Sequence, residues 1–87
     1  MKFKVSPSLI YKFEGKLDGG TTFIYNLDTG SILIGNRLIY AICKNILEYK
    51  QKNEIILYLM KEYGINKKDA VKAVESAILN KILLPEE

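Results

Sequence analysis

TFIYNLDTGSILIGN, residues Thr22 to Asn36, is the part of this 87-residue chain that specifies its architecture. Two runs rich in β-branched and aromatic residues, Thr22–Leu27 and Ser31–Ile34, flank the turn Asp28-Thr29-Gly30, whose glycine can adopt the positive φ that tight turns require. Two such runs joined by so short a turn predict a β-hairpin. A third run, Ser8–Glu14, precedes them. We therefore expect Thr22–Leu27 to be the central strand of an antiparallel sheet and Ser31–Ile34 to be an edge.

Downstream of Gly35 the apolar residues recur at helical spacing. Three helices are predicted, and their ranges are Arg37 to about Glu48, Glu54–Tyr63 and Lys67 to about Lys81. Each follows an asparagine that can act as an N-cap: Asn36, Asn53 and Asn66. The order of elements predicts one α+β domain over residues 1–87, a three-stranded antiparallel sheet followed by three helices. Met1–Val5 has two interpretations, a further short strand or a loose arm.

The chain lacks the residues that most enzymes use. It contains no histidine, the commonest general base and metal ligand, so its one cysteine, Cys43, has no histidine partner for nucleophilic catalysis. The acidic residues are scattered rather than grouped at metal-binding spacing, and Gly19-Gly20-Thr21 lacks the lysine of a phosphate-binding loop. We therefore predict a non-catalytic binding domain with no metal and no cofactor.

The single cysteine, the absence of a long apolar segment and the net charge indicate the compartment and the class of partner. A single cysteine cannot form an internal disulfide, the N-terminus lacks an apolar signal segment, and no apolar run approaches the ~18 residues of a membrane span. We expect a cytoplasmic protein that does not enter a membrane. The formal net charge of +3 suits an acidic partner, but it falls short of the dense basic stripe that tight nucleic-acid binding needs.

The expected edge strand, Ser31–Ile34, is short and β-prone and carries no charge, proline or bulge. Edge strands usually have one of these features, because an open row of N–H and C=O groups pairs readily with other chains. Two interpretations follow. Either a helix or the N-terminal arm covers the edge, or the edge is left free for a partner peptide to add a strand.

The third predicted helix carries a row of alanines. On a helical wheel, Val71, Val74 and Ile78 form the expected core stripe. The alanines run down one side of it and a more polar set down the other: Ala70, Ala73 and Ala77 against Lys68, Lys72, Glu75 and Leu79. The alanine row predicts either tight helix packing or one wall of a shallow groove. Leu79 is expected to be exposed on a basic flank.

The ordered set of these elements resembles the PqqD-like family, whose members bind the leader peptides of ribosomally made peptides. Two segments carry the resemblance, FIYNLDTGSILIGN (residues 23–36) and EIILYLMKEYGINKKDA (residues 54–70). The family pattern has an asparagine at the first helix, an isoleucine opening the second, and a Tyr-Gly-hydrophobic-Asp/Asn stop. This chain has Asn36, Ile55 and Tyr63-Gly64-Ile65-Asn66 at those places. It departs from the family in having no glycine over Leu47–Asn53, where many members have Asp-Gly-Gly.

The resemblance implies a winged-helix-like domain, in which the leader peptide adds as an antiparallel strand to the third strand and lies against the third helix. Carried onto this chain, the peptide-binding residues of the strand are Ser31, Ile32, Leu33, Ile34 and Gly35. The candidates on the third helix are Lys68, Lys72, Ala73 and Glu75. The implied partners are an acidic leader peptide with apolar anchors and a modifying enzyme or peptidase of the same pathway.

Two other functions fit the same predicted fold. In a winged-helix DNA-binding domain the second and third helices would form a helix-turn-helix. Asp69 and Glu75 lie among the lysines of the third helix, however, and Arg37 is the only arginine, which argues against base recognition. In a docking subunit of a larger enzyme, the contact would use either the same edge strand or Leu79 together with Ile82–Leu84.

Overall fold

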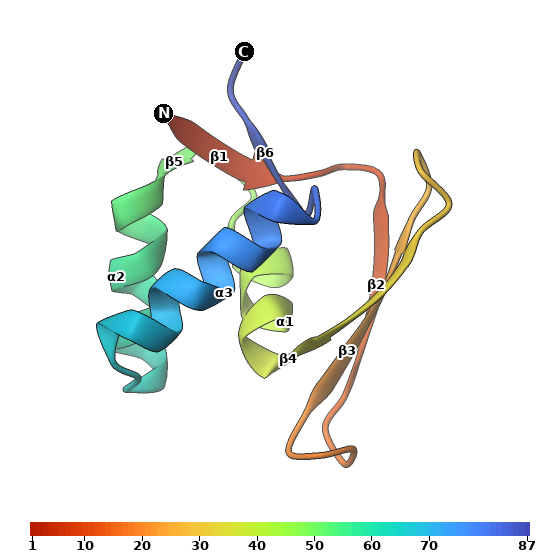
Figure 1. The fold of residues 1–87 in the computed structure, drawn as a ribbon, viewed down its shortest axis with the longest axis horizontal. Helices are drawn as coiled ribbons and strands as arrows, with labels where there is room; N and C mark the ends of the chain where they lie inside the picture. The colour runs from red at the N-terminus through yellow and green to blue at the C-terminus, as the bar shows by residue number, and fades with distance from the viewer.

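Two small antiparallel sheets and three helices make up the α+β fold of the computed structural model, which describes residues 1–87 (Figure 1). The strands are β1 (Lys2–Val5), β2 (Leu9–Glu14), β3 (Thr21–Asn26), β4 (Ile32–Asn36), β5 (Lys50–Gln51) and β6 (Leu83–Pro85). The helices are α1 (Arg37–Asn45), α2 (Lys52–Tyr63) and α3 (Lys67–Leu79). The strand orders are β2-β3-β4 and β5-β1-β6. In Figure 1 the first sheet lies to the right of the helices and the second above them.

The β2-β3-β4 sheet is the sheet that the sequence predicts, with β3 in the centre. At its hairpin turn Gly30, at φ 72°, donates its N–H to Asn26 O at 2.8 Å, while Asn26 N–H bonds to Ser31 O at 3.0 Å. This one-residue bulge places Ile32 opposite Tyr25, so the expectation that the edge run has no bulge is wrong at its first residue, Ser31. The edge strand β4 therefore begins one residue later than predicted, and it continues through Gly35 into the helix cap.

The three predicted helices are present, with shifted ends. α1 ends at Asn45 instead of about Glu48, because the chain beyond it turns to bring Lys50 and Gln51 alongside β1. α2 starts before Asn53, since its N-cap is Gln51, whose N–H donates to Glu54 Oε1 at 3.1 Å. α3 ends at Leu79, two residues before Lys81. None of the three helices has the length and apolar composition of a membrane span.

Nothing in the local sequence pattern predicts the β5-β1-β6 sheet, whose strands come from three distant parts of the chain. Met1–Val5 contains a strand and is not a loose arm, because Phe3 of β1 lies opposite Lys50 on one side and Pro85 on the other. Ile82 and Leu83 are only 3% and 1% exposed. They belong to the core and cannot form the docking surface considered above.

The core contains buried residues of all three helices, and α3 packs against both α1 and α2. The buried residues of α3 are Ala70, Ala73, Val74 and Ala77. Val71 and Ile78, expected in the core stripe, are only half-buried, so the stripe is rotated toward the alanines. Small side chains allow close approach of helices, and the alanine row therefore serves tight packing against α1 and α2. Leu79 is 80% exposed, as expected.

Gly35→Ala should destabilise the fold, because a Cβ at this position would lie 2.8 Å from Cγ1 and 2.9 Å from Cβ of Ile39. We expect the free energy of unfolding, measured by chemical denaturation, to fall by about 1–3 kcal/mol, the usual cost of overpacking. Gly15→Ala is the matched control, since its Cβ would meet only a Phe13 ring atom at 3.4 Å. A loss as large in the control as at Gly35 would contradict this account.

Candidate functional site

β4 is an open edge of its sheet. It pairs with β3 on one side and with no strand on the other. The N-terminal strand, one of the elements considered as a cover for this edge, belongs to the other sheet. The backbone groups on the outer side of β4 therefore have no strand partner within the molecule.

The hydrogen-bond register shows which groups of β4 face outward. Asn26 N–H bonds to Ser31 O at 3.0 Å, so these two residues form a bonded pair of the β3–β4 ladder. Bonded and non-bonded pairs alternate along an antiparallel ladder. Leu33 is therefore bonded to β3, whereas the N–H and C=O groups of Ile32 and Ile34 point toward the free edge.

The side chains of β4 alternate between the two faces of the sheet in the same way. Leu33 is half-buried and Gly35 contacts Ile39 of α1, so this row faces the helices. Ile32 and Ile34 lie on the opposite face and are 73% and 71% exposed. A strand added at the edge would meet an apolar row on either face.

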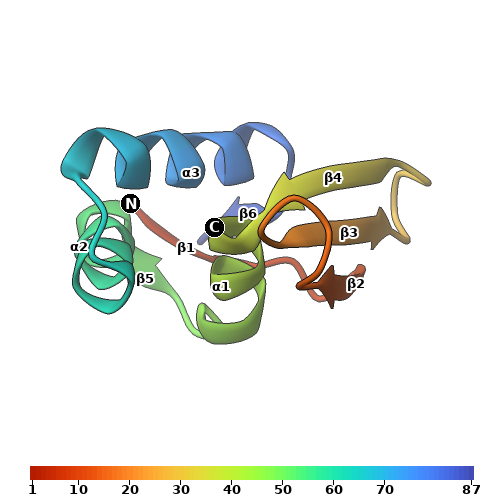
Figure 2. The same ribbon diagram turned by 90° about the horizontal axis from the view of Figure 1, so that it is seen from below.

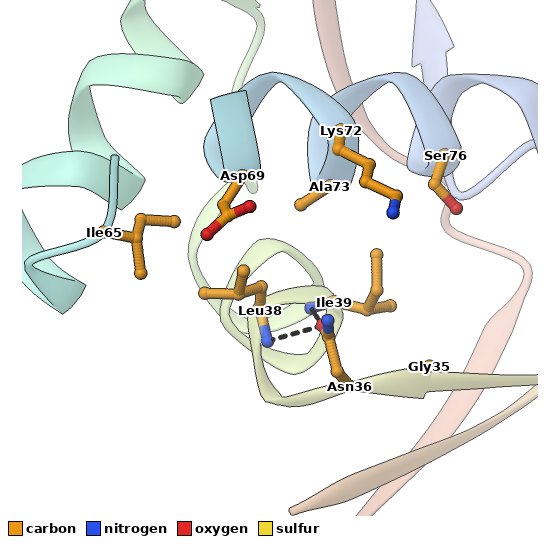
Figure 3. Close-up of a pocket in the computed structure, with 9 residues that line it drawn as sticks. All are labelled: Gly35, Asn36, Leu38, Ile39, Ile65, Asp69, Lys72, Ala73 and Ser76. Carbon is orange, nitrogen blue, oxygen red and sulfur yellow. Dashed lines mark hydrogen bonds between the residues drawn. The ribbon is translucent and has the colours of Figure 1, made fainter. Parts of the chain in front are cut away.

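A groove separates β4 and the start of α1 from α3, and Figure 2 shows α3 running along the same side of the molecule as β4. Its larger part is a cavity of about 380 Å³, drawn in Figure 3. On one side it is lined by Gly35, Asn36, Leu38 and Ile39, and on the α3 side by Asp69, Lys72, Ala73 and Ser76. A hollow of about 130 Å³ adjoins it and adds Leu33 and Asn80 to the lining. These two cavities together are named the β4–α3 groove.

The groove identifies the flank of α3 that faces β4, which the helical wheel left undetermined. Lys72 and Ala73 line it, as expected, but Lys68 and Glu75 do not. Glu75 lies on the other flank of α3, where its carboxylate is 3.6 Å from the ammonium of Lys52 in α2. Lys68 lines neither cavity of the groove. The structure therefore does not bring Lys68 and Glu75 to the groove with Lys72 and Ala73.

Several lining residues were missed by sequence reasoning. They are Asp69 and Ser76 of α3 and Asn80, which is the C-cap of this helix. Ser76 and Asn80 follow Lys72 at intervals of four residues, so helical spacing would have found them once Lys72 was known to face the groove. No signal in the sequence orients the helix, because that orientation depends on its packing against α1 and α2.

The groove has an apolar floor and a sparsely charged rim. Leu33 and Ile39 form part of the floor, and Asp69 and Lys72 are the charged side chains on its rim. Figure 3 shows the Lys72 ammonium directed from α3 toward the α1 side of the cavity. The Asn36 carboxamide is engaged in capping α1, where its Oδ1 accepts from Leu38 N–H at 3.0 Å (Figure 3). This arrangement suits an extended chain with apolar side chains directed inward and a carboxylate near Lys72.

The titratable groups outside the groove do not form a second site. No three histidine, cysteine, aspartate or glutamate side chains lie together in a way that would hold a metal ion. Cys43 is 1% exposed, and burial raises the pKa of its thiol from 9.0 to about 11. The thiol is therefore protonated at neutral pH and is not a nucleophile.

Comparison with family models, with curated proteins and with solved structures finds no match to this chain. The resemblance to PqqD-like proteins therefore rests on the residues quoted for it. The geometry of β4 and the β4–α3 groove carries the functional argument.

The raised pKa of Cys43 predicts a loss of stability at alkaline pH. The unfolded thiol loses its proton near its ordinary pKa of 9.0, whereas the folded thiol keeps it until about pH 11. Deprotonation therefore favours the unfolded chain as the pH rises through this window. We expect the wild-type protein to lose unfolding free energy relative to Cys43→Ala between pH 9 and pH 11, measured by urea denaturation. A difference that stays constant with pH would contradict the prediction.

Proposed function

We propose that this protein binds the leader segment of a ribosomally made precursor peptide and presents it to a modifying enzyme or peptidase. The peptide adds to β4 as an antiparallel strand and lies in the β4–α3 groove. The observation that carries the proposal is the outward-facing backbone of Ile32 and Ile34 beside a groove with an apolar floor. The antiparallel direction and the nature of the peptide come from the family resemblance.

The undefended character of β4 supports this function. The strand has no charged residue and no proline between Ile32 and Asn36, although it is an edge. The bulge at Gly30–Ser31 limits the edge only at its start, and the uncharged residues beyond it can pair readily with another chain, which natural sheets normally avoid. Peptide-binding domains use the same property, because main-chain hydrogen bonds supply affinity and flanking pockets supply specificity.

The arrangement of the helices beside the sheet is also part of the proposal. We regard the domain as winged-helix-like, with α2 and α3 joined by the short turn at Gly64 and the β3–β4 hairpin standing next to α3. In this arrangement α3 serves as a wall for the peptide. Asp69 lies on the groove face of α3 and Arg37 is the only arginine, so this helix is poorly suited to reading base edges.

The expected affinity is moderate. About four ladder hydrogen bonds at ~0.5–1.5 kcal/mol net each and two buried apolar anchors at ~1.5–3 kcal/mol each give roughly 5–12 kcal/mol. The loss of rotational, translational and conformational freedom offsets several kcal/mol of this sum. We expect a micromolar to high-nanomolar Kd, which requires the upper end of this sum and permits transfer of the peptide to an enzyme.

Ile34→Pro should abolish strand addition and leave the sheet folded, because the Ile34 N–H points away from β3. The probe is the tightest synthetic peptide selected on the intact chain from a random 12-residue display library, and its Kd is measured by fluorescence anisotropy. We expect Ile34→Pro to weaken binding at least about tenfold more than Ile34→Ala, which loses the side chain but keeps the N–H.

Circular dichroism of both variants checks that the fold persists. Leu33→Pro is not an equivalent test, since the Leu33 N–H bonds to β3 and its loss would disrupt the sheet itself. Failure to select any peptide that binds more tightly than about 100 µM, or equal binding by Ile34→Pro and Ile34→Ala, would refute strand addition.

Lys72→Glu should weaken binding of selected peptides that contain Asp or Glu, because the Lys72 ammonium faces the groove. We expect a loss of about threefold to tenfold in Kd, the range for an exposed charge pair that is reversed. Lys68→Glu is the matched control, with the same change of charge on the same helix but outside the groove. Equal losses in the two variants would indicate a general charge effect and contradict binding in the groove.

A further inference from the structure

The face of the β2-β3-β4 sheet that points away from the helices is apolar. Its exposed residues come from all three strands: Ile10 at 59%, Phe23 at 36%, Tyr25 at 42%, Ile32 at 73% and Ile34 at 71%. A shallow hollow of about 250 Å³ lies on this face between Ile10, Phe23, Tyr25 and Ile32. Lys12 is the charged residue beside it. The solvent face of an antiparallel sheet is ordinarily polar.

Exposure on this face is greatest at β4. Ile32 lies opposite Tyr25 and Ile34 opposite Phe23, both in the non-bonded pairs that bring side chains closest together. Each isoleucine therefore has an aromatic residue as its cross-strand neighbour in β3. On the other side, where a further strand would lie, each is open, and their backbone groups are free in the same direction.

We propose that the peptide bound at β4 carries a second row of apolar side chains that covers Ile32 and Ile34, in addition to the row in the β4–α3 groove. The ligand class is therefore a peptide with three or more consecutive apolar residues, and not one that alternates apolar and polar residues. This inference rests on the proposed strand addition. It concerns which side chains the added strand must have on the face opposite the groove.

The sequence of β4 points to the same conclusion. Ile32-Leu33-Ile34 is a continuous apolar run, which is the pattern of strands that are buried on both faces. In the isolated domain Leu33 is half-buried, whereas Ile32 and Ile34 are exposed. A strand added in register places side chains beside Ile32 and Ile34 at the spacing that cross-strand pairs require.

The test compares two variants of the outer face in peptide selection. Ile32→Thr/Ile34→Thr removes the apolar row next to the free edge, and threonine keeps the β-propensity of the strand. Ile10→Thr is the matched control, because it lies on the same face but on β2, at the opposite edge of the sheet. The random 12-residue display library is selected separately on the wild type and on both variants, each as the full chain.

We expect peptides selected on the wild type and on Ile10→Thr to be enriched in runs of three or more apolar residues. On Ile32→Thr/Ile34→Thr the enrichment should change to apolar residues at alternate positions. The best wild-type peptide should bind this double variant about 10- to 50-fold more weakly, while Ile10→Thr should change its Kd less than about threefold.

Each result that contradicts the inference has a separate interpretation. Alternating peptides selected on the wild type, with a Kd unchanged in the double variant, would overturn this inference and leave strand addition standing. Equal losses in the double variant and Ile10→Thr would mean that the whole face docks a larger partner. A dimer of the wild type in sedimentation analysis that dissociates in the double variant would assign the face to a second copy. Absence of any selected binder would overturn the inference together with strand addition.

Discussion

The junction between β4 and α1 sets the geometry on which the rest of the molecule depends. Asn36 is both the last residue of the strand and the N-cap of the helix, so no loop separates the two elements. Its Oδ1 accepts from Leu38 N–H and Ile39 N–H, while its carbonyl oxygen accepts from Thr22 Oγ1 at 2.8 Å. These bonds fix the direction in which α1 leaves the sheet. The buried alanines of α3 then bring α3 close to α1, which places it beside β4.

Small residues keep the space between β4 and α3 open. Gly35 lies directly against Ile39, and Ala73 and Ser76 face it from α3. Larger side chains at these positions would close the cavity or move the helix, because interiors are packed to high density. The same residues that allow α1 and α3 to approach the sheet therefore leave a groove next to a free edge. The contacts that stabilise the packing of α1 and α3 are therefore the same contacts that shape the proposed binding site.

An apolar edge strand carries a physical risk. Short segments with high β-propensity and no charge can pair with other copies of themselves and aggregate. In this protein the exposed run is limited to the residues between Ser31 and Gly35, where a bulge at one end and the start of α1 at the other stop the ladder. A bound peptide would cover the free backbone and both apolar rows. The same open edge is thus both the source of this risk and the basis of the proposed function.

The elements that depend on neighbouring residues were predictable. Gly30 permits the hairpin turn, Asn36 and Asn66 cap helices, and Gly64 ends α2 at φ 61°. Their effects act over a few residues, so the sequence pattern contains them. The central position of β3 followed from the same reasoning, because consecutive short connections leave one order for three antiparallel strands.

The remaining features depend on contacts between distant parts of the chain. The β5-β1-β6 sheet joins residues near position 3 to residues near 50 and 84, and no local pattern encodes that pairing. The turn at Gly30 sets which amides of β4 face outward, because one bulged residue exchanges the two registers. The packing of the alanine face decides that Lys72 and Ser76 line the groove while Glu75 pairs with Lys52. The sequence by itself determined the three helices, the β2-β3-β4 sheet and the candidate edge strand. Only the tertiary structure decided the second sheet and the orientation of the elements, because both arise from contacts between distant residues.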